Sequence, residues 1–248
     1  DLHSSLPAVL AGLRSPDGAE QPRVVYIMTD GGALPLAYSR LAAALREAGW
    51  LAGTVTAGQA WGGDIEAVSV HNALLAARHV LHADAAVVIQ GPGNLGTETP
   101  WGFSGVACGD TVNAIAALGG RAVACLRVSQ ADARARHRGV SHHSMTAYGR
   151  VALAGADIVV PDMEGELGAQ VRQEAEALCA PRRGAVQHRL IEIPSNGLLE
   201  RLRAAEAETG VRLSTMRRGL EEDTAAFITA AAAGCHVHRL LRTETARG

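Results

Sequence analysis

Short apolar runs alternate along this chain with longer segments in which apolar residues recur every three or four positions. The apolar runs are RVVYIM (23–28), LAGTVTA (51–57), AAVVIQ (85–90), RAVACLRV (121–128) and ADIVVP (156–161). They do not alternate strictly with polar residues, which is typical of strands buried on both faces. Strands that are separated by helices form parallel sheets. We therefore expect an α/β fold, a Rossmann-like three-layer sandwich with a mostly parallel sheet and helices on both faces.

Helical periodicity fills the segments between these runs. One helix is expected over residues 65–81, with Asp64 as its N-cap. Another is expected over 104–118. A further helix begins after Ser141, which is placed to cap it, and runs to about Leu153.

The last part of the chain continues this pattern. Strands are expected over 188–194 and 211–214, and helices over 196–210 and 223–241. The segment CAPRRGA (179–185) is the one plausible linker. We interpret residues 1–248 as a single α/β domain, with a main body over 1–180 and a candidate β-α-β-α extension over 185–248.

Composition and charge exclude several classes of protein. Apolar residues make up 48% of the chain and charged residues 19%, which is typical of a globular protein. The formal net charge is −2, so we expect neither a nucleic-acid partner nor attraction to an acidic membrane. No apolar run reaches the roughly 18 residues of a membrane span, and the first residues lack the basic start of a signal peptide. The four cysteines form no C-x-x-C motif, which favours reduced thiols and a cytoplasmic location.

All 23 basic side chains are arginines. Because the chain has no lysine amine, it cannot form a Schiff base or attach pyridoxal phosphate, and it has no P-loop. These exclusions leave a divalent metal open as a cofactor.

Polar, glycine-rich loops follow the predicted strands at their carboxyl ends, where open parallel sheets bind ligands. The opposite ends of the strands carry fewer functional groups. Asp30, in the first loop, is a candidate to act in catalysis by holding a metal or a hydroxyl group, or simply to cap the next helix. The candidate ligand-binding residues are Thr29, Gly31, Gly32, Gly58, Gln59, Asp64, Gly91, Gly93, Asn94, Gly96, Thr97, Arg136, Arg138 and Ser141.

The loop GPGNLGT (91–97) has its three glycines at the spacing of a dinucleotide-binding turn. However, Pro92 removes a backbone N–H group, and the next strand does not end in the acidic residue that would bind a ribose. The loop either holds an anion with its backbone N–H groups or packs tightly without a ligand. Hydrolysis or group transfer is therefore favoured over hydride transfer.

The stretch HRGVSHHSMTAYGR (137–150) gathers three histidines. His142 and His143 fall in the first turn of the helix after Ser141, where the positive helix end favours neutral imidazole. Together with His137 they are candidates for general acid/base catalysis. Neighbouring residues on a helix point about 100° apart, so we expect only one of the pair to aim squarely into the cleft.

Arginines beside these histidines favour an anionic ligand. Arg134, Arg136 and Arg138 lie on one side of the loop if it is extended, and guanidinium groups bind phosphate or carboxylate through paired hydrogen bonds. A metal is the alternative, although the arginines disfavour a cation unless a phosphate bridges both. The candidate metal ligands are His3, His137, His142 or His143, with Asp30 or Asp64.

Several separate blocks of this sequence are similar to one family. They are DLHSSLPAVLAGL, IMTDGGALPLAYSRL, GPGNLGTET, RHRGVSHHSMTAYGRVAL and LSTMRRGLEEDTAAFITAAAAG, which together extend along essentially the whole chain. On these blocks the chain resembles the uncharacterised bacterial family known as domain of unknown function 3866. The resemblance implies an upstream β-rich region that is missing here, and it implies no particular reaction. Met216 is followed by Arg217, where a glycine is more usual in that family.

Our first hypothesis is an enzyme that binds a small anionic, phosphorylated or nucleotide-like molecule at the carboxyl edge of the sheet and catalyses hydrolysis or group transfer. A second hypothesis is a metabolite-sensing or regulatory domain that uses the same cleft without catalysis. A third is a structural or assembly domain, in which alanine-rich helices pack between subunits of a homo-oligomer.

Overall fold

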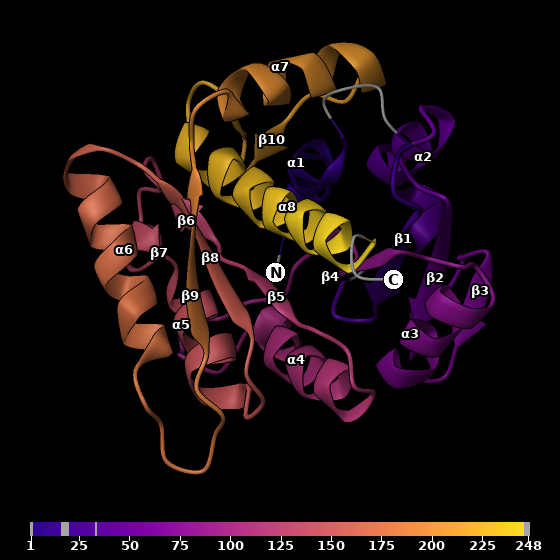
Figure 1. Ribbon diagram of the computed structural model, residues 1–248, viewed down its shortest axis with the longest axis horizontal. Coiled ribbons are helices and arrows are strands. Elements are labelled where there is room, and N and C mark those ends of the chain that lie inside the picture. The colour runs from indigo at the N-terminus through magenta and orange to yellow at the C-terminus, as the bar shows by residue number, and fades with distance from the viewer. Residues whose placement is uncertain (1, 16–19, 33, 246–248) are drawn as a thin grey trace.

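The computed structural model describes residues 2–15, 20–32 and 34–245. Its fold is mixed α/β, as predicted, with parallel sheets and helices packed against them (Figure 1). No helix in these ranges combines the length and the hydropathy that crossing a lipid bilayer requires.

Four parallel strands form the first sheet, in the order β3-β2-β1-β4. Val25 and Ile27 of β1 pack on the side of α3, whereas Tyr26 and Met28 point into the core that contains α1 and α8. Apolar residues therefore occur at five consecutive positions of this strand, Val24–Met28, because both of its faces are covered. The elements are β1 (Val24–Thr29), β2 (Gly53–Ala57), β3 (Ile65–Ala67), β4 (Ala85–Gln90), α2 (Arg40–Glu47) and α3 (Val70–His79).

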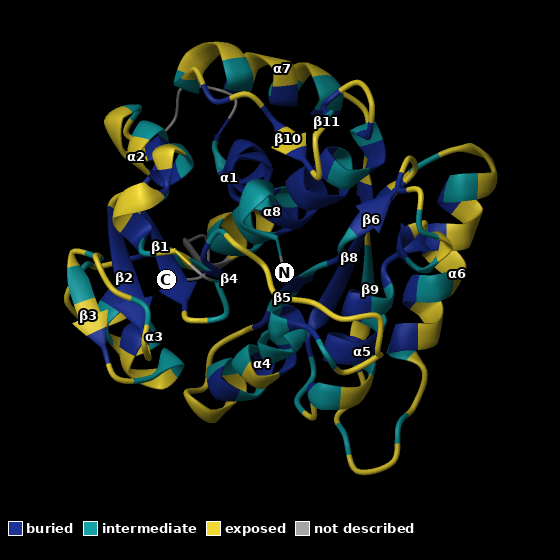
Figure 2. Cartoon of the chain, turned by 180° about the vertical axis from the view of Figure 1, so that it is seen from behind, coloured by how far each residue is buried: buried dark blue, intermediate teal, exposed yellow. Residues whose placement is uncertain are grey.

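Three further parallel strands form a second sheet, in the order β5-β8-β9. The helix α6 packs on this sheet and leaves its outer side exposed, whereas α8 contacts the same strands and is largely buried (Figure 2). The strands that were expected in one sheet thus form two parallel sheets, because β4 and β5 are not paired. These elements are β5 (Val123–Cys125), β8 (Asp157–Asp162), β9 (Arg189–Pro194), α4 (Ala107–Ala117), α6 (Gly165–Cys179) and α8 (Thr224–Thr245).

Two short antiparallel ribbons and three more helices complete the fold. One ribbon pairs β6 with β7 next to the helix α5, and the other pairs β10 with β11 after the helix α7. The bounds are β6 (Val128–Ser129), β7 (Gly139–Val140), β10 (Ser214–Thr215), β11 (Arg218–Gly219), α1 (Leu6–Leu13), α5 (His142–Thr146) and α7 (Leu198–Thr209).

The helices α1 and α8 pack at very short range. A Cβ atom at Gly12 would collide with the carbonyl oxygen of Ala231, and one at Gly234 would collide with that of Val9. Glycine and alanine at these positions allow the two backbones to touch, which buries all eight residues of α1.

One predicted helix boundary is wrong. The residues after Asp64 form strand β3, which pairs with β2, and α3 begins only at Val70. Its N-cap is Ser69, whose side chain accepts a hydrogen bond from the backbone N–H of Asn72. The helix after Ser141 reaches close to its expected end at about Leu153, but it changes from α-helical to π-helical geometry after Thr146 and ends at Val151.

Candidate functional site

The three histidines lie in a short chain segment that forms a 3₁₀ turn, strand β7 and helix α5 in succession. Arg134 precedes a 3₁₀ turn over Ala135–His137, after which β7 leads directly into α5. Gly139, the first residue of β7, has a φ of 65°, a conformation that glycine adopts without steric strain. Ser141 is the N-cap of α5, because its Oγ accepts a hydrogen bond from the backbone N–H of His143 at 3.2 Å. The turn and the helix therefore place His137 over the start of α5.

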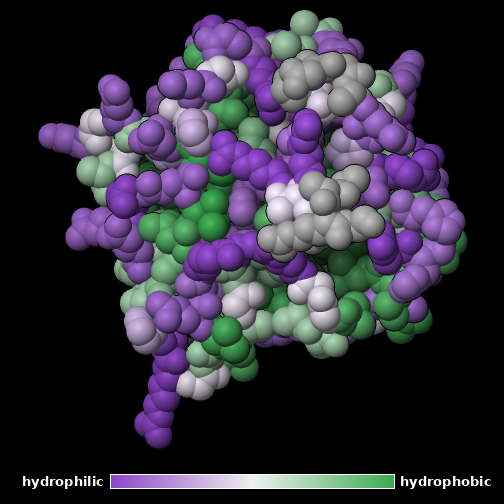
Figure 3. All heavy atoms as spheres, in the orientation of Figure 1, coloured by the Kyte–Doolittle hydropathy of each residue, from purple (hydrophilic) through white to green (hydrophobic). Residues whose placement is uncertain are grey.

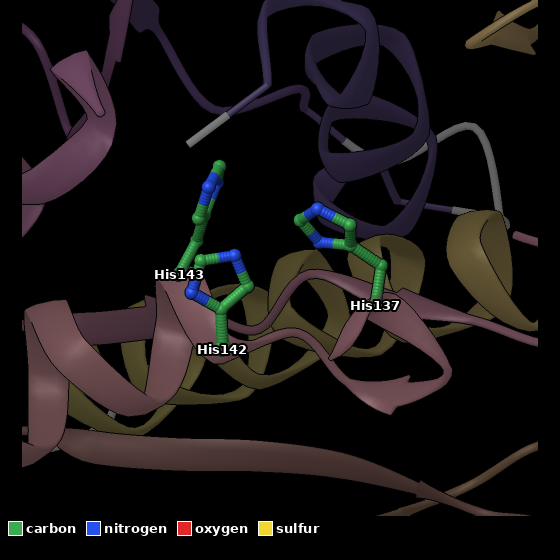
Figure 4. Close-up of side chains that lie close together, drawn as sticks. All are labelled: His137, His142 and His143. Atoms are coloured by element: carbon green, nitrogen blue, oxygen red, sulfur yellow. The ribbon is translucent and has the colours of Figure 1, made fainter. Parts of the chain in front are cut away.

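The rings of His137, His142 and His143 converge, and we refer to them as the histidine cluster (Figure 4). Each ring offers one nitrogen, and these three nitrogens lie within 4.8 Å of one another. The ring centres of His142 and His143 are only 4.4 Å apart, and the expectation that only one of the pair aims squarely into a cleft stays a prediction.

Other parts of the chain fix two of these rings. His137 Nδ1 lies 2.7 Å from the hydroxyl oxygen of Ser141. Phe103 stacks on the ring of His143, with centres 3.8 Å apart and planes inclined by 2°. The guanidinium of Arg127 donates a hydrogen bond to His143 Nδ1 at 3.1 Å. Because arginine can only donate, a neutral His143 carries its proton on Nε2.

All three histidines are neutral at pH 7. Burial is the largest cause, and it lowers the pKa of His142 from 6.5 to about 4 and those of His137 and His143 to about 3. The positive charge of Arg127 adds to the shift for His137 and His143. The neutral state that the sequence predicts from the helix N-terminus is therefore produced mainly by loss of solvent.

Two buried aspartates neutralise part of the positive charge around the cluster. The guanidinium of Arg134 makes two hydrogen bonds of 2.9 Å to the carboxylate of Asp132 and holds the pKa of that group well below its usual range. Arg218 contacts the carboxylates of both Asp132 and Asp223. Arg127 is close to Asp132 as well, at 4.0 Å.

The three alternating arginines do not share one side of the loop. The 3₁₀ turn sends Arg134 to Asp132, while Arg138 donates to the carbonyl oxygen of Asp132 at 3.0 Å. Arg136 alone reaches toward the loop that follows β4, where Glu98 lies 3.8 Å away. The loop is thus not extended, and only Arg136 remains a candidate to hold an anion from this group.

Two buried polar atoms of this chain segment have no hydrogen-bond partner within the described residues. They are Nε2 of His142 and Nε of Arg136. The charge of Arg136 also contributes to the low pKa of His142, which shows that the two groups interact. A buried donor without a partner is costly, so these atoms indicate a ligand at this position.

Asp30 braces a turn at the edge of the first sheet. Its carboxylate accepts a hydrogen bond from the backbone N–H of Gln59 at 2.9 Å, and a Cβ atom at Gly58 would collide with it. It does not cap α2, whose N-cap is Ser39. The same edge contains Gln90, a buried residue that the sequence analysis missed and whose amide oxygen and nitrogen have no partner within the described residues.

The glycines of these loops bring β1 and β4 together. Gly31 packs against the side chain of Gln90, and Gly32 packs against the backbone of Gly91 and forms a bridge with Asn94. Gly96 forms a second bridge, to Phe103. The loop after β4 therefore connects the edge of the first sheet with the histidine cluster. The predicted residues at this edge are Thr29, Asp30, Gly31, Gly32, Gly58, Gln59, Gly91, Gly93 and Asn94.

Thr97 lies farther along the same loop, where its backbone N–H bonds to the carbonyl oxygen of Gly102 and its hydroxyl lies 2.8 Å from that of Thr99. These hydrogen bonds join two parts of the same loop, Thr97 and the segment from Thr99 to Gly102. The position of Thr97 supports the shape of the loop that delivers Phe103.

Two predicted site residues lie elsewhere. Asp64 sits at the amino end of β2, where its carboxylate binds the backbone N–H and hydroxyl of Thr54 and the guanidinium of Arg46. His3 uses both ring nitrogens, one with the Tyr26 hydroxyl at 2.9 Å and one with Ser39 at 2.7 Å. Neither residue belongs to the histidine cluster, because each is already committed to a structural contact.

Sequence reasoning also missed Arg127 and Phe103. Arg127 lies directly before β6, and its basic side chain at the end of an apolar run was the available signal. Phe103 follows the glycine-rich loop, and no pattern in the sequence indicates that its ring stacks on His143.

One family model matches residues 1–234, and its description is protein of unknown function (DUF3866). No curated protein and no solved structure matches the chain. Because the matched region covers nearly all of the sequence, this chain belongs to the DUF3866 family.

Proposed function

We propose that this protein binds a small oxyanion, such as a phosphorylated or nucleotide-like molecule, at the histidine cluster and catalyses hydrolysis or group transfer there. The observation that carries the proposal is a pair of buried polar atoms, His142 Nε2 and Arg136 Nε, that have no hydrogen-bond partner within the described residues. The guanidinium of Arg127, which donates to His143 Nδ1, adds a positive charge that also lowers the pKa of His142.

The two buried atoms without a partner support the same ligand. Nε of Arg136 is always a donor, so its missing partner is an acceptor such as an anionic oxygen. His142 Nε2 lies in the same neighbourhood and either donates to that oxygen or accepts a proton from an attacking hydroxyl or water.

Binding of an anion would also raise the pKa values of the three histidines. In the described structure burial and the nearby positive charges hold their pKa values at about 3 to 4, which is too low for efficient proton transfer at pH 7. A negative charge beside neutral imidazoles raises their pKa toward neutrality. The substrate itself would therefore prepare the general acid or base.

The test is titration with inorganic phosphate by calorimetry at low salt, using the wild-type chain, Arg136→Ala and Arg40→Ala. We expect Arg136→Ala to weaken phosphate binding by about tenfold or more, since a charge-assisted hydrogen bond contributes about 1.5–3 kcal/mol. Arg40 is exposed on α2, so its removal should leave the affinity unchanged. Equal affinities for all three proteins would refute an anion site at the cluster.

Catalysis is tested separately with aryl phosphates and nucleotides. If His142 takes part in proton transfer, His142→Ala should abolish turnover and keep phosphate binding within severalfold. Phosphate binding by a wild-type chain that turns over none of these compounds would favour the regulatory alternative.

A metal centre is the second candidate, and the convergence of three neutral imidazole nitrogens within 4.8 Å favours it. A metal on His143 would require Arg127 to release Nδ1, because metal-bound neutral imidazole donates through its other nitrogen. Elemental analysis of the wild-type protein and of His142→Ala, both purified without chelator, shows whether the histidine cluster holds a metal or an anion. Stoichiometric metal that is lost in the variant would assign the cluster to a metal.

We further propose a cytoplasmic location. The four cysteines are free thiols in the structure, which fits a reducing compartment.

A further inference from the structure

Two strands, β4 and β5, each have one edge that is not paired with another strand in the part of the chain that the structure describes, and both edges border the same cavity. β4 is the last strand of the first sheet and β5 is the first strand of the second, and no pairing joins them within the described residues. A cavity of about 630 Å³ lies between these edges. This inference concerns a place apart from the histidine cluster and does not rest on the proposed function.

The cavity runs along the backbone of both strands. Side chains of a strand alternate between its two faces, so a cavity above one face would contact every second residue. Here five consecutive residues of β4, Ala85–Ile89, line the cavity, and so do the consecutive residues 120–123 that enter β5. The cavity therefore borders the edges of the strands, where backbone N–H and C=O groups point outward.

Helices close the cavity above and below the plane in which β4 and β5 lie. From α4 and its C-cap residue Leu118 it is lined at helical spacing, the α4 residues being Cys108, Thr111, Val112 and Ile115. From α8 it is lined by Ala233, Val237, Leu240 and Leu241. Hydrophobic side chains also reach the surface over α3 and α4 (Figure 3), and Leu75, Val80 and Leu118 are among the exposed ones. The space is thus a slot in the plane of the sheets, with apolar helices above and below.

The chain direction across the slot is the same on both sides. β4 and β5 are successive strands joined by a helical crossover, a 3₁₀ turn over Ser104–Val106 followed by α4, which is the kind of connection that parallel strands use. Leu2 lines both this cavity and a smaller one formed by residues 126–129, which directly follow β5. The carboxyl end of the slot is therefore near Leu2.

We propose that the slot takes up an extended apolar polypeptide strand, which pairs in parallel with β4 and β5 and ends beside Leu2. The strand would join the two sheets into one continuous parallel sheet in the order β3-β2-β1-β4, the added strand, β5-β8-β9. Each edge offers a row of backbone groups that need partners, and a polypeptide supplies them on both sides. An alkyl chain would fill the volume and leave those groups unpaired.

The lining also specifies the strand's composition. Both the α4 and the α8 side of the slot are mostly aliphatic, so side chains on both faces of the added strand meet apolar surface. Charged residues occur where β4 and β5 begin, at Arg78, Asp84 and Arg121. We therefore expect a valine-rich centre with a polar residue at the amino end.

The test fuses a valine-rich strand of six residues directly ahead of the first residue and compares it with a fusion that carries proline at its second and fourth positions. Hydrogen exchange measured by mass spectrometry follows β4 and β5, with the outer edge strands β3 and β9 as internal controls. We expect exchange in β4 and β5 to slow at least about tenfold, exchange in β3 and β9 to stay unchanged, and Tm to rise by several degrees. The proline fusion should show neither effect, because proline has no N–H group to donate.

The same valine-rich strand is also added as a free peptide to the folded, unfused protein, so that a fusion that misfolds does not decide the result. Unchanged exchange in β4 and β5 with both the fusion and the peptide would overturn the proposal. Stoichiometric binding of decanoic acid that neither form of the strand displaces would also overturn it and would assign the slot to a lipid-like ligand.

Discussion

The three rings of the histidine cluster are kept neutral by burial, which makes the stability of the protein depend on pH. Their pKa values are about 3 to 4 in the folded chain and near 6.5 when the chain is unfolded. Between these values the unfolded chain binds more protons, so acid favours unfolding in this window. Above pH 7 the histidines are neutral in both states and contribute no pH dependence.

We predict that the free energy of unfolding falls as pH is lowered from about 6.5 toward 4, by up to about 1.4 kcal/mol per pH unit for each buried histidine. Urea unfolding at pH 7.5, 6 and 5 measures this slope. His142→Gln should reduce the slope, whereas His71→Gln, on the exposed surface of α3, should not. The same slope in all three proteins would show that the cluster is not the source.

Ser141 combines two roles, as the cap of α5 and as the partner of His137. We predict that Ser141→Ala lowers the free energy of unfolding by about 1–3 kcal/mol and weakens phosphate binding severalfold, because His137 loses its orientation. Ser69→Ala, which removes the corresponding cap of α3, should cost about 1 kcal/mol and leave phosphate binding intact. If both variants bind phosphate equally well, Ser141 acts as a cap alone.

At the scale of elements, the β10–β11 hairpin contains a local conflict. Its two turn residues, Met216 and Arg217, have φ values of 48° and 65°, the left-handed conformation of a type I′ turn. Glycine is favoured in this conformation, and residues with a side chain are not.

We predict that Arg217→Gly stabilises the protein by about 0.5–1 kcal/mol, which corresponds to a rise in Tm of about 1–3 °C. Arg217→Ala keeps the strained φ and should give no increase in Tm. Calorimetry of the two variants therefore separates the effect of relieving backbone strain from the effect of losing the arginine side chain. A lower Tm for Arg217→Gly would mean that the arginine side chain contributes more than the turn costs.

Elements with a long apolar run could be predicted from the sequence, and those set by a few residues could not. β1, β2, β4 and β8 are each recognisable as apolar runs. β3 is only three residues long and ends two residues before α3, so the sequence pattern predicts its residues as the first turn of the helix. β6 and β7 are two residues each, too short for any periodicity to show.

The site was predictable as a neighbourhood, and its geometry was not. Clustering in the sequence already placed His137, His142 and His143 together. The partners Phe103 and Arg127 come from other loops, and only tertiary packing brings them to the rings. The separation of Asp64 from the site depends on β3, because that strand places its carboxylate at the amino end of β2.

On the scale of the whole molecule, the two sheets share one core that α1 and α8 hold together. Residues of β1, β8, β9 and α7 belong to the same hydrophobic cluster as these two helices. The sequence predicted parallel strands and covering helices, but a division into two sheets has no signature in local periodicity. It depends on which edges meet, and this is decided by packing between distant segments.

The close packing of α1 against α8 also has a consequence for synthesis on the ribosome. α1 ends at Leu13 and α8 begins only at Thr224, so α1 leaves the ribosome long before α8, yet every residue of α1 is buried in the finished protein. Until α8 has left the exit tunnel, the apolar surface of α1 has no permanent cover. Such long-range contacts slow folding and expose nascent chains to aggregation, so the core around α1 is completed only after α8 has been translated.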